Sequence, residues 1–194
     1  MMDYEYVKAY TVAEQLAKRL ERSCEKLQIA GSLRRRATVV HDIEIVAMPK
    51  IEEMPDLLGE THALRSRLDD TLDELVEERV LKLFPGAKRG PRMKQFAVQP
   101  LGIKVDLFIV LPPAQWGTLL AIRTGPAHYS HWLVTRREMG GALPNHLRVK
   151  DGAVMTIYGS NVIETPTEQD FFALLGMDKV PDPDSREPEW RQRL

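Results

Sequence analysis

The predicted fold is decided by one stretch, Gly31-Ser32-Leu33-Arg34-Arg35-Arg36, and by the segment that follows it, His41-Asp42-Ile43-Glu44-Ile45-Val46. Asp42 and Glu44 alternate with isoleucines, so on a β-strand the two acids share one face and the isoleucines share the other. The isoleucine face would pack against a core. Two neighbouring carboxylates repel each other unless a cation compensates them, so the acidic face is a candidate site for divalent cations.

The Gly31-Ser32 turn at the start of this stretch is suited to binding phosphate. Its backbone N–H groups and the serine hydroxyl can donate to an anion, and a helix that begins there adds a favourable dipole. Arg34, Arg35 and Arg36 bring positive charge to the same place, although Arg34 is also compatible with a position in solvent. One short segment therefore combines carboxylates for metal with donors for phosphate, as a nucleoside triphosphate with magnesium requires.

A third candidate acid, Asp106, lies within the apolar run from Ile103 to Leu111. A nearly continuous apolar run predicts a central strand of a sheet, where burying a bare carboxylate is costly. A metal ion shared with Asp42 and Glu44 would compensate the charge. An ion pair between Asp106 and a lysine or arginine is the alternative.

In their order and spacing these motifs resemble the signature of the polymerase-beta-like nucleotidyltransferases, and most closely the family X DNA polymerases. The resemblance covers roughly residues 10–188 and rests on Gly31-Ser32, the Arg pair, Asp42-x-Glu44, Asp106 and Thr124-Gly125. It implies an α+β fold, with a nucleotidyltransferase palm that has helices on one face of a mixed β-sheet. The implied division is a palm over 1–111, a small α/β nucleotide-selecting subdomain over 112–178 and a loosely held tail over 179–194.

The resemblance also implies the chemistry and its residues. A hydroxyl would attack the α-phosphate of a nucleoside triphosphate in line, with two Mg²⁺ ions, or Mn²⁺ in their place, held by Asp42, Glu44 and Asp106. These three acids are the predicted catalytic and metal-binding residues. The predicted nucleotide-binding residues are Gly31, Ser32, Arg35, the N–H of His41, Thr124 and Gly125.

The acceptor implied by the closest resemblance is a DNA 3′-hydroxyl, as in gap-filling repair. Residues 84–150 carry ten Lys/Arg and two acids, a net charge of +8, whereas residues 51–83 carry ten acids and four Lys/Arg, a net charge of −6. A basic segment of this kind predicts contacts with DNA phosphates.

Two alternatives stay open at this point. A small-molecule or protein acceptor is suggested by Glu44, where family X usually has Asp, and by Ile122 and Arg123, where it usually has aromatics. Arg123 could then bind phosphate or pair with the substrate. The other alternative is a non-catalytic nucleotide- or DNA-binding domain that retains the fold.

The composition limits the class of protein. The 194 residues, 43% of them hydrophobic, suffice for one large or two small domains, and the net charge is −1. A single cysteine, Cys24, excludes an internal disulfide. We find no signal-peptide pattern and no apolar run near the ~20 residues that span a membrane. We therefore expect a cytoplasmic, monomeric protein without a membrane partner.

Local patterns predict most of the secondary structure. The predicted elements are amphipathic helices over 5–26 and 60–83, strands over 27–30, 41–48, 93–99 and 103–111, helices over 115–123 and 126–140, and a hairpin over 147–155. Thr167 and Asp170 predict a capping box at the start of the last helix.

Overall fold

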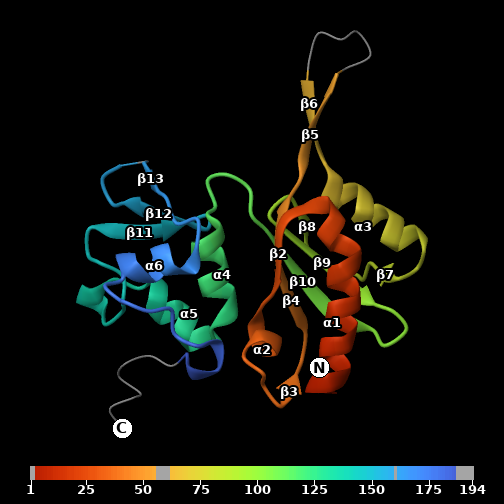
Figure 1. Cartoon of the computed structure of the whole chain (residues 1–194), viewed down its shortest axis with the longest axis horizontal. Helices are drawn as coiled ribbons and strands as arrows, with labels where there is room; N and C mark the ends of the chain where they lie inside the picture. Colours follow the sequence, from red (N-terminus) through yellow and green to blue (C-terminus); the bar gives the residue numbers. More distant parts are fainter. Residues whose placement is uncertain (1–2, 56–61, 160, 187–194) are drawn as a thin grey trace.

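A mixed six-stranded sheet carries the predicted catalytic strands in the computed structural model, which describes residues 3–55, 62–159 and 161–186 (Figure 1). The sheet comprises β2 (Cys24–Ile29), β4 (Ile43–Pro49), β10 (Ile103–Ile109), β9 (Met93–Val98) and β7 (Leu81–Lys82) in that order, with β8 (Arg89–Gly90) paired to β9. The pair β4–β10 is parallel and the other neighbouring strands are antiparallel. The predicted α+β class with a mixed sheet is confirmed.

The register between β4 and β10 places the acidic strands side by side. Glu44 lies opposite Asp106, and Ile45 lies opposite Leu107. β10 lies between β4 and β9, so the prediction of a central strand from its apolar sequence is confirmed. Paired residues of neighbouring strands point to the same face, so Glu44 and Asp106 share one face of the sheet.

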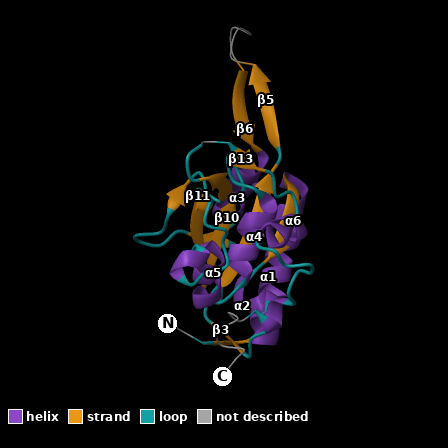
Figure 2. Ribbon diagram, turned by 90° about the vertical axis from the view of Figure 1, so that its left-hand side faces the viewer, coloured by secondary structure: helices purple, strands orange, loops and turns teal. Residues whose placement is uncertain are grey.

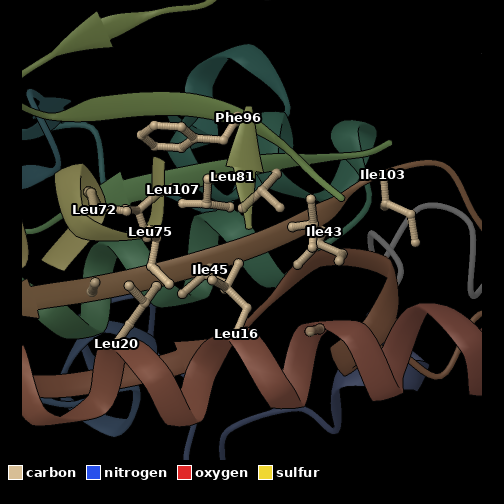
Figure 3. Packing of buried hydrophobic residues seen from close by; sticks show 14 of the residues in the cluster. Leu16, Leu20, Ile43, Ile45, Leu72, Leu75, Leu81, Phe96, Ile103 and Leu107 are labelled. Atoms are coloured by element: carbon tan, nitrogen blue, oxygen red, sulfur yellow. The ribbon is translucent and has the colours of Figure 1, made fainter. Parts of the chain in front are cut away.

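The opposite face forms the larger hydrophobic core. It is covered by α1 (Tyr6–Leu20) and α3 (Arg67–Glu77). Ile43 and Ile45 are fully buried there, as the alternation of acids and isoleucines predicts. Figure 3 shows Leu16 of α1 close to Ile45, within the same apolar cluster.

The acidic face is not left open along its whole length. Beyond Glu44 and Asp106, the next residues on this face are Val46 and Phe108, and α4 (Trp116–Thr124) packs against them. The expectation that helices cover only one face is therefore wrong at this end of the sheet. Apolar side chains on both faces of central strands require cover on both sides.

The C-terminal region has its own apolar cluster. It contains α5 (Ala127–Val134), α6 (Glu168–Leu174) and a sheet of β11 (Leu147–Lys150), β12 (Ala153–Thr156) and β13 (Val162–Ile163). The predicted hairpin is confirmed: Asp151 and Gly152 both have positive φ at its turn. The capping box of Thr167 and Asp170 is confirmed as well.

Three predicted helices are too long. The helix predicted over 126–140 ends at Val134 in α5, and a separate 3₁₀ turn follows at Arg137–Met139. The helix predicted over 5–26 ends at Leu20 and continues as a short 3₁₀ turn, η1 (Glu21–Ser23). The following strand, β2, starts at Cys24 instead of Leu27 because it pairs with β4 along its length, beginning at Pro49. Helical periodicity in the sequence did not reveal this pairing.

The helix predicted over 60–83 is shortened at both ends. Ser66 caps α3 by accepting a hydrogen bond from the Asp69 N–H, and Leu81 joins the sheet in β7. A hairpin of β5 (Ile51–Pro55) and β6 (His62–Ser66) precedes α3 and extends away from the sheet (Figure 2). Part of this predicted helix, residues 60 and 61, lies outside the described residues.

Four smaller elements complete the described chain: β1 (Tyr4–Glu5) pairs with β3 (Val39–Val40), and two 3₁₀ turns, η2 (Arg137–Met139) and η3 (Pro183–Ser185), lie in the C-terminal region. No helix within the described residues is long and apolar enough to cross a membrane.

The join between α4 and the chain before α6 provides a test of this packing. Gly117 donates its N–H to Thr165 O at 2.9 Å, and a Cβ added to Gly117 would collide with the backbone carbonyl of Thr167. We expect Gly117→Ala to lower the free energy of unfolding by about 1–3 kcal/mol in urea denaturation. Gly90→Ala is the control, because its new Cβ would lie 3.9 Å from the nearest atom, Met93 O. Equal stability of the two variants would contradict the packing described.

Candidate functional site

The three predicted acids converge on one face of the sheet. Glu44 and Asp106 are opposite each other on β4 and β10, and Asp42 immediately precedes β4. The Lys104 ammonium lies 2.8 Å from Asp106 Oδ2 and 3.5 Å from Asp42 Oδ2. Side chains that are more than 60 positions apart in the sequence thus meet around one lysine.

Asp106 is the most buried of the three acids, with 8% of its surface exposed. Its second oxygen, Oδ1, accepts a hydrogen bond from Gln95 Nε2 at 2.9 Å, from the opposite position on β9. The ion pair with a lysine, which the sequence left open as an alternative, is present in the structure between Asp106 and Lys104. Gln95 was not singled out from the sequence, because only the register of β9 against β10 brings it to this site.

The Glu44 carboxylate is held in an unfavourable environment for its charge. Burial raises its pKa to about 7, the charges of Asp42 and Asp106 act in the same direction, and Arg123 and Arg35 oppose them. Gly31, with a φ of +58°, lies against this carboxylate, so that a Cβ at Gly31 would collide with Glu44 Oε2. Glycine at this position thus serves both the backbone conformation and the close approach of Glu44.

The donors at this site suit a divalent cation. Asp42, Glu44 and Asp106 offer hard carboxylate oxygens, which Mg²⁺ and Mn²⁺ prefer, and the raised pKa of Glu44 indicates negative charge that the protein compensates only in part. Within the described ranges, no three His, Cys, Asp or Glu side chains lie together as a group that could hold a metal ion in this arrangement of side chains. The Lys104 ammonium bridges two of the three acids in this arrangement.

Lys104 itself responds to the acids that surround it. Burial acts to lower its pKa, but its bonds to Asp106 and Asp42 and their charges outweigh burial and raise it. Lys104 therefore stays charged and offsets part of the repulsion between the acids. The sequence places Lys104 two positions before Asp106, on the same face of the strand, but does not reveal its contact with Asp42.

The Gly31-Ser32 turn begins a one-turn helix, α2 (Gly31–Arg34), beside the acids. Ala30 N donates to Glu44 O at 2.8 Å and fixes the turn against β4. Arg35 Nη1 donates to Thr124 O at 2.6 Å, so the predicted phosphate-binding turn and the Thr124-Gly125 turn lie together. These residues were predicted separately, and the structure makes them neighbours.

His41 is only loosely connected to this group. Its imidazole is exposed and its Nδ1 lies 2.9 Å from Asp3 Oδ1. The prediction concerned the backbone N–H of His41, which follows α2 and precedes Asp42. The side chain makes its contact with the N-terminal segment and not with the acids.

Arg34 joins the sheet region to the C-terminal region. Its guanidinium donates to both carboxylate oxygens of Glu168, at 3.0 and 2.6 Å, and to Thr124 Oγ1 at 2.7 Å. Glu168 also pairs with Arg186 at 2.9 Å. The position of Arg34 in solvent that the sequence allowed is therefore wrong.

Arg186 falls within the segment 179–194 that was expected to be loosely held. It is 1% exposed and also donates to Pro181 O and Ala121 O. The expectation is wrong at this residue, and residues 187–194 lie outside the described part of the chain. Glu168 was the missed partner, since the sequence indicated it only as the first residue of a helix.

Comparison with known proteins gives no family assignment: no protein-family model matches the chain, and no curated protein is significantly similar to it.

Arg123, the next-to-last residue of α4, packs its side chain on Phe108 of β10. Its Cζ is 3.9 Å from the centroid of the Phe108 ring, and its Nε is buried without a hydrogen-bond partner among the described residues. Burial lowers its pKa, while the charges of Glu44 and Asp106 act to raise it. The guanidinium is therefore electrostatically coupled to two of the three acids.

The basic segment 84–150 is less available than its net charge suggests. Several of its members bond within the protein: Arg92 with Asp151, Lys94 with Asp69, Arg136 with Glu138, Arg137 with Leu175 O and Arg148 with Gly159 O. Arg89 is exposed on β8 at the edge of the sheet. The segment forms several separate basic positions on different elements.

The raised pKa of Glu44 predicts how stability varies with pH. Between the ordinary value of 4.5 and about 7, the folded protein binds a proton at Glu44 more tightly than the unfolded chain does. This contribution to stability is present below pH 4.5 and is lost as the pH rises through 7. The free energy of unfolding of Glu44→Gln, measured relative to that of the wild type, should therefore increase by about 2 kcal/mol between pH 5 and pH 8.5.

The measurement is urea unfolding of both proteins in EDTA across this pH range. Glu14→Gln is the matched control, because the Glu14 side chain is 49% exposed on α1. Parallel pH profiles for Glu44→Gln and the wild type would rule out the buried carboxylate with a raised pKa described above.

The pair between Arg34 and Glu168 predicts a large loss of stability. Glu168→Gln leaves the buried Arg186 and the half-buried Arg34 without their counter-charge, and should lower the free energy of unfolding by about 3 kcal/mol. Glu78→Gln removes an exposed pair with Arg19 of similar length, 2.7 Å, and should cost less than about 1 kcal/mol. The free energy of unfolding of the two variants is measured by chemical denaturation. A similarly small loss of stability in both would contradict the predicted importance of Glu168.

Proposed function

We propose that this protein is a metal-dependent nucleotidyltransferase, with a palm of the polymerase-beta-like kind that is closest to a minimal family X DNA polymerase. The observation that carries the proposal is the register of Glu44 against Asp106, with Asp42 joined to Asp106 through Lys104. Three separate acids on one face of a sheet, beside a Gly-Ser turn, are suited to two-metal phosphoryl transfer.

Each group of residues at the site has its own proposed role. Asp42, Glu44 and Asp106 would hold two Mg²⁺ or Mn²⁺ ions, which when bound supply activation of the attacking hydroxyl and stabilisation of the leaving pyrophosphate. The Gly31-Ser32 turn offers N–H and hydroxyl donors to the triphosphate, and Arg35 adds a guanidinium. Thr124-Gly125, bonded to Arg35 through Thr124 O, would position the sugar and base of the nucleotide.

The acceptor that we propose is the 3′-hydroxyl of DNA, at a primer end or in a gap. The support is the basic segment 84–150, of which Arg89 remains exposed at the edge of the same sheet. Contacts from such residues to phosphates would give salt-dependent, sequence-tolerant binding.

A second candidate is transfer of a nucleotide to a small molecule or a protein. It is favoured by the internal bonds of much of the basic segment, exemplified by Arg92 with Asp151 and Lys94 with Asp69. The use of Glu44 in place of Asp at the second acid supports it also. The two candidates share the metal site and differ only in the acceptor.

The experiment is nucleotide addition to primed, gapped and single-stranded DNA with Mg²⁺ or Mn²⁺. We expect extension by the wild type and a loss of at least about 100-fold in Asp106→Asn, because removing a metal ligand costs at least as much as removing one of its outer partners. Asp73→Asn, on the exposed surface of α3, is the matched control and should retain activity.

The outcomes separate the candidates. Extension that Asp106→Asn retains would contradict the assigned site. No extension by the folded wild type, together with transfer of labelled nucleotide to a non-DNA acceptor, would favour the second candidate. Nucleotide binding without any transfer would indicate a binding domain and would contradict both.

A further inference from the structure

Arg123 is fixed in an unusual position beside the acids. It is the next-to-last residue of α4, directly before Thr124, and its guanidinium stacks on Phe108 with 3.9 Å between Cζ and the ring centroid. Phe108 follows Asp106 by two positions on β10 and therefore lies on the same face of the sheet. Stacking on an aromatic ring restricts the guanidinium, so its donors are held next to Asp106.

One donor of this guanidinium is not satisfied by the protein. Arg123 Nε is buried and has no hydrogen-bond partner among the described residues, including Glu44 and Asp106. Buried donors of charged groups nearly always have a partner, because leaving them unpaired is costly. The protein therefore does not supply all the hydrogen-bond partners of this guanidinium, which lies beside the candidate site.

The other two arginines next to the site have partners in the fold. Arg34 binds both carboxylate oxygens of Glu168, and Arg35 donates to Thr124 O. These bonds hold α2 against the C-terminal region. Arg123 differs from both, since its guanidinium is held by a ring stack and keeps donor capacity for another group.

We propose that Arg123 is a substrate-binding residue whose guanidinium donates to the phosphate groups of a nucleotide held beside Glu44 and Asp106. The inference rests on the proposed function, because it uses the same acids as the reaction centre. A guanidinium binds phosphate through a planar fork of N–H donors. It also offsets the repulsion that the acids would exert on an incoming anion, so the site selects phosphorylated nucleotides over nucleosides.

The test is equilibrium binding by calorimetry in Mg²⁺, with full-length wild type, Arg123→Met, Arg123→Lys and Arg22→Met. The ligands are the non-hydrolysable α,β-imido analogue of dATP, inorganic tripolyphosphate and deoxyadenosine. We expect Arg123→Met to weaken binding of the two phosphate ligands about 10- to 100-fold and to leave deoxyadenosine unchanged. The affinity of Arg123→Lys for the phosphate ligands should lie between those of the wild type and Arg123→Met, because lysine keeps the charge and loses the fork of donors.

Arg22→Met is the matched control and should bind all ligands as the wild type does. Arg22 is exposed in η1, next to the end of β2 that pairs with Pro49, which is the far end of β4 from Glu44. Thermal unfolding of each variant checks the fold, and Arg123→Lys provides the test if Arg123→Met does not fold.

Each result decides one of the two proposals. Equal binding of the dATP analogue by wild type and Arg123→Met overturns the role of Arg123, as does an equal loss for deoxyadenosine, which would indicate a sugar contact. Failure of the wild type to bind either phosphate ligand overturns it as well. Binding that depends on Arg123, in a protein that transfers no nucleotide to any acceptor, supports the role of Arg123 and overturns the proposed function.

Discussion

The parallel pairing of β4 with β10 is the constraint on which the site depends. Its register places Glu44 opposite Asp106 and leaves Ile45 and Leu107 to the core on the other face. A shift of one residue would turn the acids into that core and the apolar side chains toward the site. The burial of the isoleucine face thus fixes where the acids lie, and the stability of the sheet and the geometry of the site have the same origin.

Charge compensation is the second requirement, because three acids on one face repel each other. The structure meets it with side chains from several elements. Lys104 bridges Asp42 and Asp106, Gln95 donates to Asp106, and the charge of Arg123 acts on Glu44. The pKa of Glu44 is raised to about 7, first by burial and then by the charges of Asp42 and Asp106, and the two arginines offset only part of this shift. Carboxylate oxygens are the donors that divalent cations prefer, and binding such cations is the role proposed for these acids.

The Gly31-Ser32 turn, predicted to bind phosphate, is joined to the C-terminal region by the arginines that follow it. Arg34 reaches Glu168 of α6 and Arg35 reaches Thr124 of α4, while Arg186 completes the ion pairs from the end of the described chain. Because these bonds cross between the two apolar clusters, they set the position of the Thr124-Gly125 turn relative to the acids. Positive charge that the sequence suggested for substrate thus also holds the structure together.

The sequence alone determined the features that depend on nearby residues: the alternation of Asp42 and Glu44 with isoleucines, the Asp151-Gly152 turn and the capping box before α6. It did not determine the ends of the first two helices, because strand pairing by Cys24 and Leu81 overrides helical periodicity. Contacts such as Arg34 with Glu168, 134 positions apart, were decided only by the tertiary structure. Local patterns reflect backbone geometry over a few residues, whereas such pairs depend on how whole elements pack.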